Sequence, residues 1–288
     1  MSPTTDIRPE HLRGGAWPWP VASLATPTGR IAVTDVGQGP TVLLVHAGMT
    51  SLVWRDVIAL LSTDHRCVTL DAPGNGLTGA SSGGPPGLAG AARAVGDVID
   101  GLGLNDLTLV FHDLGGPAAL AAAGERVDRV DALVAVNTFG WAPDSALLRI
   151  GLAAMGSAPM RALDGASRWL PRATATGLGA GRRWDPATRA AFLRLMDADA
   201  SRATHDYFRD GLRTDVPAAA DRALDALADR PLTTVFGARN DYFGFQRRWR
   251  DRFPRARQEV VPRGNHFPMC DAPEDVARWI REARHAEG

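Results

Sequence analysis

The chain has 288 residues, of which 45% are hydrophobic, and carries 32 basic and 32 acidic side chains. This length and composition suffice for one α/β domain with an inserted subdomain and a large core. The zero net charge and the lack of long basic runs exclude the electrostatic footprint of a nucleic-acid-binding protein, and no apolar run approaches the roughly 20 residues that a membrane-spanning helix needs.

Residue usage also excludes several kinds of chemistry. Every basic side chain other than histidine is an arginine, which excludes a lysine nucleophile or Schiff base. The two cysteines, Cys67 and Cys270, lack the spacing of metal ligands, and no Gly-rich dinucleotide motif follows a strand, so we expect neither a metal nor a cofactor. The N-terminus has no apolar stretch typical of a secretion signal, and we therefore expect a reduced, cytoplasmic protein.

The first part of the chain alternates between predicted strands and helices. Residues 1–27 are Pro-rich and are expected to form an irregular N-terminal segment. Alternating residues predict a strand over 29–36, and the continuous apolar run 41–46 predicts a central parallel strand buried on both faces. A further strand is expected over 66–71, and an Ala-rich helix over 89–102. This order predicts a mostly parallel sheet with right-handed crossovers.

The stretch 107–120 changes from a strand to a helix at its middle. Apolar or β-branched residues fill 107–111, the sequence His-Asp-Leu-Gly-Gly follows over 112–116, and Ala and Leu then recur at helical spacing. A sharp strand-to-helix turn needs small residues beside its apex, and in the G-x-S-x-G nucleophile elbow the apex residue is Ser. Here the apex residue is Asp113. The alternative interpretation is an ordinary turn with Asp113 as a helix N-cap.

After a predicted strand over 131–137 the pattern changes to amphipathic helices without a clear strand. We predict a helical cap over 141–225, and most of its large apolar side chains are expected to form the core of the cap itself. The cap divides an α/β core into a first part, 28–140, and a second part, 226–288.

Two further polar residues follow strands in the second part of the core. Asp241 comes shortly after a strand predicted over 233–237, and His266 comes after a last strand over 258–261. The order Asp113, Asp241, His266 is the order nucleophile, acid, base of a hydrolase built around a nucleophile elbow.

These motifs together resemble the α/β-hydrolase superfamily, and within it the aspartate-nucleophile branch of haloalkane dehalogenases and epoxide hydrolases. The elbow of that branch reads H-D-x-G-[GA], which residues 112–116 match, and the turn over 71–76 resembles the D-x-P-G-x-G turn of the superfamily. The resemblance covers roughly residues 28–283. It implies an α/β-hydrolase fold, with helices on both faces of a mostly parallel sheet and an inserted helical cap, and it implies an enzyme.

The resemblance also implies a role for each candidate residue. Asp113 would attack an sp³ carbon and form an alkyl ester. His266, oriented by Asp241, would remove a proton from the water that hydrolyses this ester. The backbone N–H groups of Gly48 and Leu114 would form the oxyanion hole.

The group that stabilises the leaving atom departs from the family pattern. Haloalkane dehalogenases commonly carry Asn at the position of Gly48 and Trp at the position of Leu114, and both side chains hold the departing halide. In this chain Trp141 or Trp169 would have to replace one of these donors. Met49, next to Gly48, is a further candidate for substrate contact.

For an epoxide the predicted proton donor is Tyr207, although the W-Y-R pattern of epoxide hydrolases places its Tyr at Phe208. We expect hydrolysis of an epoxide on a small-to-medium apolar substrate, with haloalkane dehalogenation and a non-catalytic or other hydrolase-fold protein as alternatives. The expected partner is a small apolar molecule, without nucleic acid or membrane, and the chain is expected to be a monomer or a homodimer.

Overall fold

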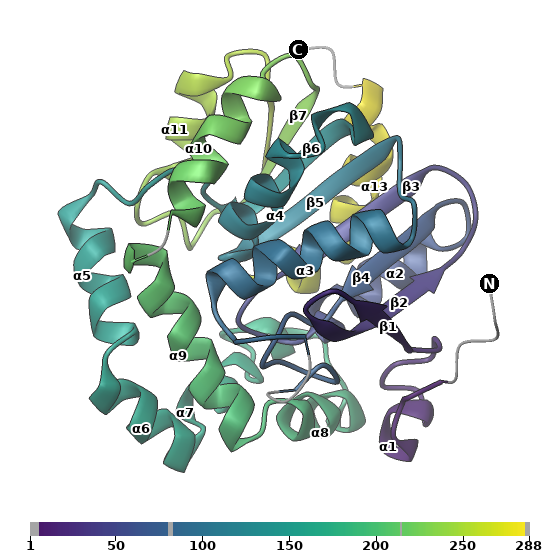
Figure 1. Cartoon of the computed structure of the whole chain (residues 1–288), viewed down its shortest axis with the longest axis vertical. Coiled ribbons are helices and arrows are strands. Elements are labelled where there is room, and N and C mark those ends of the chain that lie inside the picture. The colour runs from purple at the N-terminus through teal and green to yellow at the C-terminus, as the bar shows by residue number, and fades with distance from the viewer. Residues whose placement is uncertain (1–5, 80–82, 214, 286–288) are drawn as a thin grey trace.

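The computed structural model describes residues 6–79, 83–213 and 215–285, and in these residues eight strands form one sheet (Figure 1). The order across the sheet is β1-β2-β4-β3-β5-β6-β7-β8. The pairs β1–β2 and β2–β4 are antiparallel, and all the other pairs are parallel. The strands are β1 (Ala22–Thr26), β2 (Gly29–Val36), β3 (Thr41–His46), β4 (Arg66–Leu70), β5 (Leu107–Asp113), β6 (Val130–Thr138), β7 (Leu232–Gly237) and β8 (Arg257–Val261).

The central strands are buried on both faces because helices cover both sides of the sheet. Successive side chains of a strand point to opposite faces, and β3 follows this rule: Leu43 and Val45 join one hydrophobic cluster, whereas Val42 and Leu44 join the other. The predicted mostly parallel sheet is therefore present, with strands at the expected places in the chain.

Two helical layers enclose this sheet (Figure 1). One layer consists of α3 (Leu88–Gly101), α4 (Gly115–Gly124), α10 (Val216–Ala226) and α11 (Phe245–Arg252). The other consists of α2 (Arg55–Leu61), α12 (Pro268–Asp271) and α13 (Pro273–Glu282). Short 3₁₀ turns occur at Ser51–Trp54, Val127–Arg129, Ala180–Arg182 and Ala283–His285. Among the described residues no helix is both long and apolar enough to cross a bilayer.

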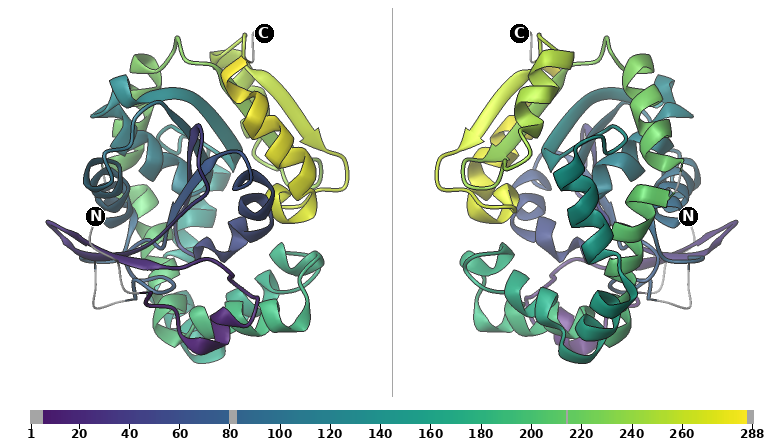
Figure 2. Two further views of the ribbon diagram at one scale, coloured as in Figure 1. Left: turned by 90° about the vertical axis from the view of Figure 1, so that its right-hand side faces the viewer. Right: turned by 90° about the vertical axis from the view of Figure 1, so that its left-hand side faces the viewer.

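The helical cap lies between β6 and β7 in the chain and gathers at one end of the sheet in both side views (Figure 2). It consists of α5 (Ala146–Met155), α6 (Ala158–Ser167), α7 (Trp169–Thr174), α8 (Pro186–Leu195) and α9 (Ala198–Arg213). The predicted cap boundary at residue 225 is too late, because α10 packs on α4 in the core layer. A Cβ atom added to Gly124 of α4 would lie only 2.8 Å from the Cβ atom of Ala223.

A buried His–Asp pair joins the cap helices to one another. His205 of α9 and Asp164 of α6 have fully buried side chains, with 3.0 Å between Nε2 and Oδ2. The Nδ1 atom of His205 lies 2.6 Å from the carbonyl oxygen of Met155 at the end of α5. The other Asp164 oxygen accepts a hydrogen bond from the backbone N–H of Leu170 in α7, at 2.9 Å.

The N-terminal segment is more regular than the prediction for 1–27, of which residues 1–5 lie outside the described part. It contains the short helix α1 (Glu10–Arg13) and the edge strand β1. Trp17 is buried, and its indole N–H donates to Thr34 Oγ1 at 3.1 Å. The apolar side chains of this segment therefore pack on the core and do not form a solvated tail.

Candidate active site

The strand-to-helix turn at Asp113 has the strained backbone of an elbow. Asp113 ends β5 with a φ of +51°, a conformation uncommon for a residue other than glycine. Close packing explains the two glycines that follow. A Cβ atom would lie 2.9 Å from the Val45 carbonyl oxygen at Gly115, and 2.0 Å from Thr138 Oγ1 at Gly116. The Thr138 hydroxyl donates to the carbonyl oxygen of Asp113 at 2.6 Å and holds the turn in place.

The structure brings Asp113 and His266 together. His266 lies in the loop between β8 and α12, and its Nε2 atom is 3.6 Å from Asp113 Oδ2. The two side chains are partly exposed, 33% for His266 and 25% for Asp113, so that a substrate and water can reach both. The carboxylate also stands at the N-terminus of α4, where the helix dipole favours a negative charge.

The structure corrects the predicted partner of His266. The oxygen atom at its Nδ1 belongs to Asn240, with 2.8 Å between Nδ1 and Oδ1. The carboxylate of Asp241 accepts instead from the backbone N–H groups of Phe245, at 2.7 Å, and Gln246, at 3.2 Å. Asp241 thus caps the start of α11, because the turn after β7 directs it to that helix and directs the preceding residue to the imidazole.

A second asparagine, which the sequence analysis missed, supports this arrangement. Asn137 lies in β6, next to the elbow strand, with a φ of +37°. Its Oδ1 accepts from the Gly237 backbone N–H at 3.0 Å, and its Nδ2 donates to the carbonyl oxygens of Asn265 at 2.9 Å and His266 at 3.0 Å. The position of Asn137, a polar residue at the carboxyl end of a parallel strand beside the elbow, could have identified it as a site residue from the sequence.

Two buried imidazoles lie beneath the pair. His112 precedes Asp113, and His46 lies next to it across the sheet, with 5.0 Å between the ring centroids. The Nε2 atom of His112 donates to the His266 carbonyl oxygen at 2.7 Å, since a carbonyl can only accept. Within the described residues neither nitrogen of His46 has a hydrogen-bond partner.

Electrostatics keep Asp113 ionised and these two histidines neutral. Burial alone would raise the pKa of the Asp113 carboxyl, but the interaction with His266, and more weakly with His112 and His46, lowers it to about 2. Burial lowers the pKa of His46 to about 4 and that of His112 well below its usual value. The Asp113 carboxylate is therefore available as a nucleophile at neutral pH.

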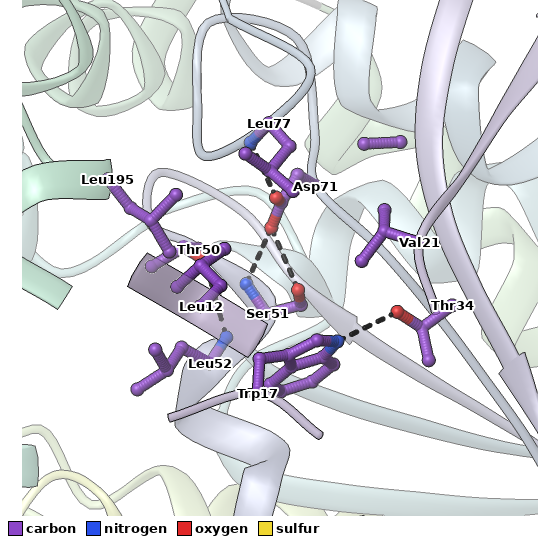
Figure 3. Close-up of a pocket in the computed structure, with 11 residues that line it drawn as sticks. Leu12, Trp17, Val21, Thr34, Thr50, Ser51, Leu52, Asp71, Leu77 and Leu195 are labelled. Carbon is purple, nitrogen blue, oxygen red and sulfur yellow. Dashed lines mark hydrogen bonds between the residues drawn. The ribbon is translucent and has the colours of Figure 1, made fainter. Parts of the chain in front are cut away.

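The loop that carries Gly48 is held from two sides. Gly48 has a φ of +87°, and its carbonyl oxygen accepts from Thr204 Oγ1 of the cap helix α9 at 2.6 Å. Ser51, further along the same loop, donates its backbone N–H and its hydroxyl to the Asp71 carboxylate at 2.7 and 2.9 Å (Figure 3). This carboxylate also accepts from the Leu77 N–H at 2.8 Å. The cavity beside Asp71 measures about 10 Å³, room for about one water molecule and far too little for a substrate.

Leu114, the second predicted oxyanion residue, directly follows Asp113 and lies at the N-terminus of α4. Its side chain is buried and faces the cap: a Cβ atom added to Gly211 of α9 would lie 3.8 Å from a Leu114 methyl group and 3.6 Å from Leu152 of α5. The cap and Leu114 thus form an apolar wall next to the carboxylate.

The predicted proton donor Tyr207 does not fit that role. Its hydroxyl donates to the carbonyl oxygen of Pro73 at 2.6 Å, and burial raises its pKa. Because a backbone carbonyl already accepts its proton, Tyr207 joins the cap to the turn after β4 and is not free to protonate a leaving group.

Of the other predicted contact residues, Trp141 and Met49 are buried, and Trp169 is half-buried. Trp141 packs against Phe245 and Trp249, with the Arg248 guanidinium 4.3 Å from its ring. Met49 lies in the hydrophobic cluster on the α2 side of the sheet. In the described residues the indole N–H groups of Trp141 and Trp169 have no hydrogen-bond partner. No cluster of three or more His, Cys, Asp or Glu side chains in this part of the chain is arranged to hold a metal.

Comparison with known proteins identifies the family. The model of the alpha/beta hydrolase family matches residues 42–279. The chain therefore belongs to the α/β-hydrolase family, which confirms the predicted fold class and the prediction of an enzyme.

Similar proteins narrow this assignment. Haloalkane dehalogenase 2 of Mycobacterium tuberculosis is 30% identical over 88% of this chain and 91% of its own length. A cis-3-alkyl-4-alkyloxetan-2-one decarboxylase of Shewanella oneidensis is 25% identical over 85% of this chain and 82% of its own. The solved structure of the epoxide hydrolase CorEH superposes with a TM-score of 0.74 at 20% identity, covering 91% of this chain and 97% of that one. The chain is thus an α/β-hydrolase related to haloalkane dehalogenases, as the resemblance predicted, and it shares its fold with an epoxide hydrolase.

Proposed function

We propose that this hydrolase acts in two steps through an alkyl ester on Asp113. The observation that supports this most directly is the elbow itself, a carboxylate at a positive-φ apex, 3.6 Å from the Nε2 atom of His266. A carboxylate can attack an electrophilic sp³ carbon, and the ester that results is open to attack by water.

In the first step an Asp113 oxygen forms a bond to the substrate carbon, and the bond from that carbon to the leaving group breaks. In the second step His266 takes a proton from water, whose oxygen attacks the ester carbonyl of Asp113. The N–H groups of Gly48 and Leu114 hold the negative charge on the carbonyl oxygen. The alcohol then leaves with the proton from His266. The Asp113 carboxyl releases the other proton of the water to solvent, which regenerates the carboxylate and, for an epoxide, balances the proton that the ring oxygen takes up from solvent.

For the leaving group we propose the oxygen of an epoxide on a small-to-medium apolar substrate. Gly48 and Leu114 have no polar side-chain atom with which to hold a departing halide, and an unpaired ion in an apolar site is costly. An epoxide oxygen stays tethered to the product and needs a single donor. With Tyr207 bonded to Pro73, the indole N–H groups of Trp141 and Trp169 remain as candidates.

The second candidate is hydrolytic dehalogenation, which the similarity to haloalkane dehalogenase 2 favours. Gly48→Asn with Leu114→Trp would restore both halide donors. At Gly48 a Cβ atom would meet its nearest neighbour, Thr204 Cγ2, at an ordinary 3.7 Å, so there is space for it, but the φ of +87° strains the backbone of any residue other than glycine. A rise in bromide release from bromoalkanes in this folded double variant would support dehalogenation, and no rise would favour the epoxide.

The two-step proposal is tested by removing the base. His266→Gln should still form the ester but not hydrolyse it, because a general base contributes about 10²–10⁴-fold. Intact-protein mass spectrometry should then show an adduct that maps to the peptide with Asp113, and the control variant Asp113→Ala should show none. An epoxide adds its full mass, whereas a haloalkane adds its mass less hydrogen halide. If no adduct forms with a substrate that the wild type turns over, the covalent mechanism is wrong.

A further inference from the structure

The acid of the expected catalytic triad is replaced by an amide. His266 Nδ1 contacts Asn240 Oδ1 at 2.8 Å, and the same oxygen lies 3.4 Å from Asn137 Nδ2. In the described residues no carboxylate lies within hydrogen-bond or ion-pair distance of Nδ1. The imidazole is therefore oriented by neutral groups on one side and faces the Asp113 carboxylate on the other.

The hydrogen bonds determine how both amides are turned. The Gly237 backbone N–H can only donate, so the Asn137 atom that accepts it is the oxygen. The NH₂ group of Asn137 then faces the carbonyl oxygens of Asn265 and His266 and also the Asn240 side chain. The Asn240 oxygen lies 3.4 Å from this NH₂ group and 2.8 Å from Nδ1 of His266, an arrangement in which Nδ1 carries the proton. Once Asp113 is an ester and no longer presents a carboxylate to Nε2, the lone pair of Nε2 can act as a base.

A lone asparagine beside a catalytic histidine does not ensure this tautomer. Its NH₂ group can turn toward the imidazole and force the proton onto Nε2, which disables the base. Asn137 disfavours that arrangement because two NH₂ groups would then face each other. Asn137 and Asn240 are thus positioning residues, which act on the reaction through His266.

An amide orients the imidazole but does not neutralise the positive charge that it gains as a base. The groups that face His266 are Asp113 and His112 of β5, Asn137 of β6 and Asn240 after β7. His46 of β3 contacts His112. Asp271, which is paired with Arg182, accepts a hydrogen bond from the backbone N–H of Asn265, the residue before His266. Once Asp113 is an ester, it has lost its charge, and no other carboxylate in the described part of the chain contacts the imidazole.

We infer that, in this chain, the pair of Asn137 and Asn240, which replaces the triad acid, makes hydrolysis of the Asp113 ester slower than its formation. The inference rests on the proposed function. Formation of the ester needs the Asp113 carboxylate and no base, so the amide leaves it unaffected. Hydrolysis needs a cationic imidazole in the transition state, and here that cation lacks a carboxylate partner.

The first experiment uses the wild-type enzyme and an epoxide that it turns over. Rapid mixing and acid quench, followed by intact-mass analysis, should show that most of the enzyme carries the adduct during steady-state turnover. Consumption of the epoxide should begin with a burst whose size approaches the enzyme concentration, whereas the diol should form without a burst, because it is released only when the ester is hydrolysed. If the adduct is undetectable in the wild type but accumulates in His266→Gln, the two-step mechanism holds and the inference is wrong. If neither protein forms an adduct, the proposed function itself is wrong.

The second experiment changes Asn240, the residue that contacts His266. An aspartate in Asn240→Asp can accept from both His266 and Asn137, so the rate of ester hydrolysis should rise on the order of tenfold and the adduct should disappear from steady state. The acidic limb of this rate should move by about 1–3 pH units to higher pH, since an adjacent carboxylate favours the protonated imidazole. The matched control is Asp241→Asn, which keeps a helix-capping side chain and should leave both steps unchanged.

A double-variant cycle separates tautomer control from mere support of the fold. Asn137→Ala should slow ester hydrolysis by tenfold or more in the wild-type background, because the Asn240 amide is then free to turn. In the Asn240→Asp background the loss should be much smaller, since a carboxylate has no wrong orientation. Equal losses in both backgrounds, or an unchanged hydrolysis rate in Asn240→Asp, would overturn the inference.

Discussion

At the scale of single residues, the elbow keeps Asp113 in a conformation that an aspartate adopts at a cost. The left-handed region costs an L-residue about 1–2 kcal/mol, and here the φ of +51° is enforced by the Thr138 bond to the Asp113 carbonyl. Strain of this kind is retained where the surroundings determine the backbone, and it is typical of functional sites.

This strain predicts a difference in stability between two inactive variants. Asp113→Gly relieves the positive φ and Asp113→Ala does not, so the glycine variant should have a free energy of unfolding about 1 kcal/mol higher than the alanine variant. Urea unfolding followed by circular dichroism measures both. Equal stability would contradict a strained elbow, and turnover by either variant would exclude Asp113 as the nucleophile.

Tyr207 provides a second prediction. Its hydroxyl is bonded to the Pro73 carbonyl, so Tyr207→Phe should lower the free energy of unfolding by about 1–2 kcal/mol, because a buried carbonyl loses its partner. Ester formation in a single turnover should stay within about threefold, far from the 10²–10⁴-fold loss that removal of a general acid causes. A large loss confined to epoxide opening would restore Tyr207 as the acid.

The residue beside His266 marks the limit of what the sequence predicts. A strand followed by Asn240-Asp241 suggests a carboxylate as the triad acid, whereas the other two motifs pointed to Asp113 and His266, which the structure brings together. Which of two adjacent residues faces the imidazole depends on the turn, in which the Asn240 N–H bonds to the Gly237 carbonyl and Asp241 reaches α11. A shift of the turn by one residue would place Asp241 instead of Asn240 beside His266, and the hydrophobic pattern of the sequence does not determine where the turn falls.

At the scale of elements, the hydrophobic pattern predicted the strands and helices whose side chains are buried in the core. The apolar run 41–46 is β3 as expected, since such a run suits only a strand covered on both faces. The edge strand β1 was missed because its residues are only partly buried and carry no clear period. The end of the cap was misplaced because α9 and α10 are both amphipathic, and only the packing of α10 on α4 shows that it belongs to the core.

Within the cap, the pair of His205 and Asp164 predicts a large stability effect. Both side chains are fully buried, and together they contact α5, α6, α7 and α9. Asp164→Ala leaves a buried imidazole without its partner and should lower the free energy of unfolding by about 3–5 kcal/mol. The double variant Asp164→Leu with His205→Phe removes both polar groups and should recover part of this loss. A loss below 1 kcal/mol in Asp164→Ala would contradict the role of this pair.

At the scale of the whole molecule, the carboxyl ends of neighbouring strands assemble the site. Asp113 ends β5, Asn137 lies near the end of β6, Asn240 follows β7, and His266 follows β8. Parallel strands bring these ends to one edge of the sheet, which is where open α/β folds bind their ligands, and the cap covers that edge.

The buried histidines also make the stability of the whole fold depend on pH. Burial holds the pKa of His46 at about 4, below that of an unfolded chain. Between pH 6.5 and 4 the unfolded chain therefore binds a proton that the folded chain does not, and the free energy of unfolding must fall as the pH is lowered through this range. His46 alone accounts for about 3 kcal/mol, and His112 acts in the same direction.

Urea unfolding of the wild type at pH 7 and pH 4.5 measures this loss. His46→Leu, which cannot bind a proton, is the matched control and should lose less stability between these two pH values. A wild type whose free energy of unfolding is constant across this range would contradict the account of neutral, buried imidazoles.

The central claim is that Asp113 forms the bond to the substrate, and a single turnover in ¹⁸O-labelled water tests it most directly. Water attacks the ester carbonyl of Asp113, so the product of the first turnover should carry an unlabelled oxygen taken from the enzyme. The peptide that contains Asp113 should gain one ¹⁸O atom, detected by mass spectrometry after digestion. Label found only in the product, with none in this peptide, would mean that water attacks the substrate directly and would contradict the covalent mechanism.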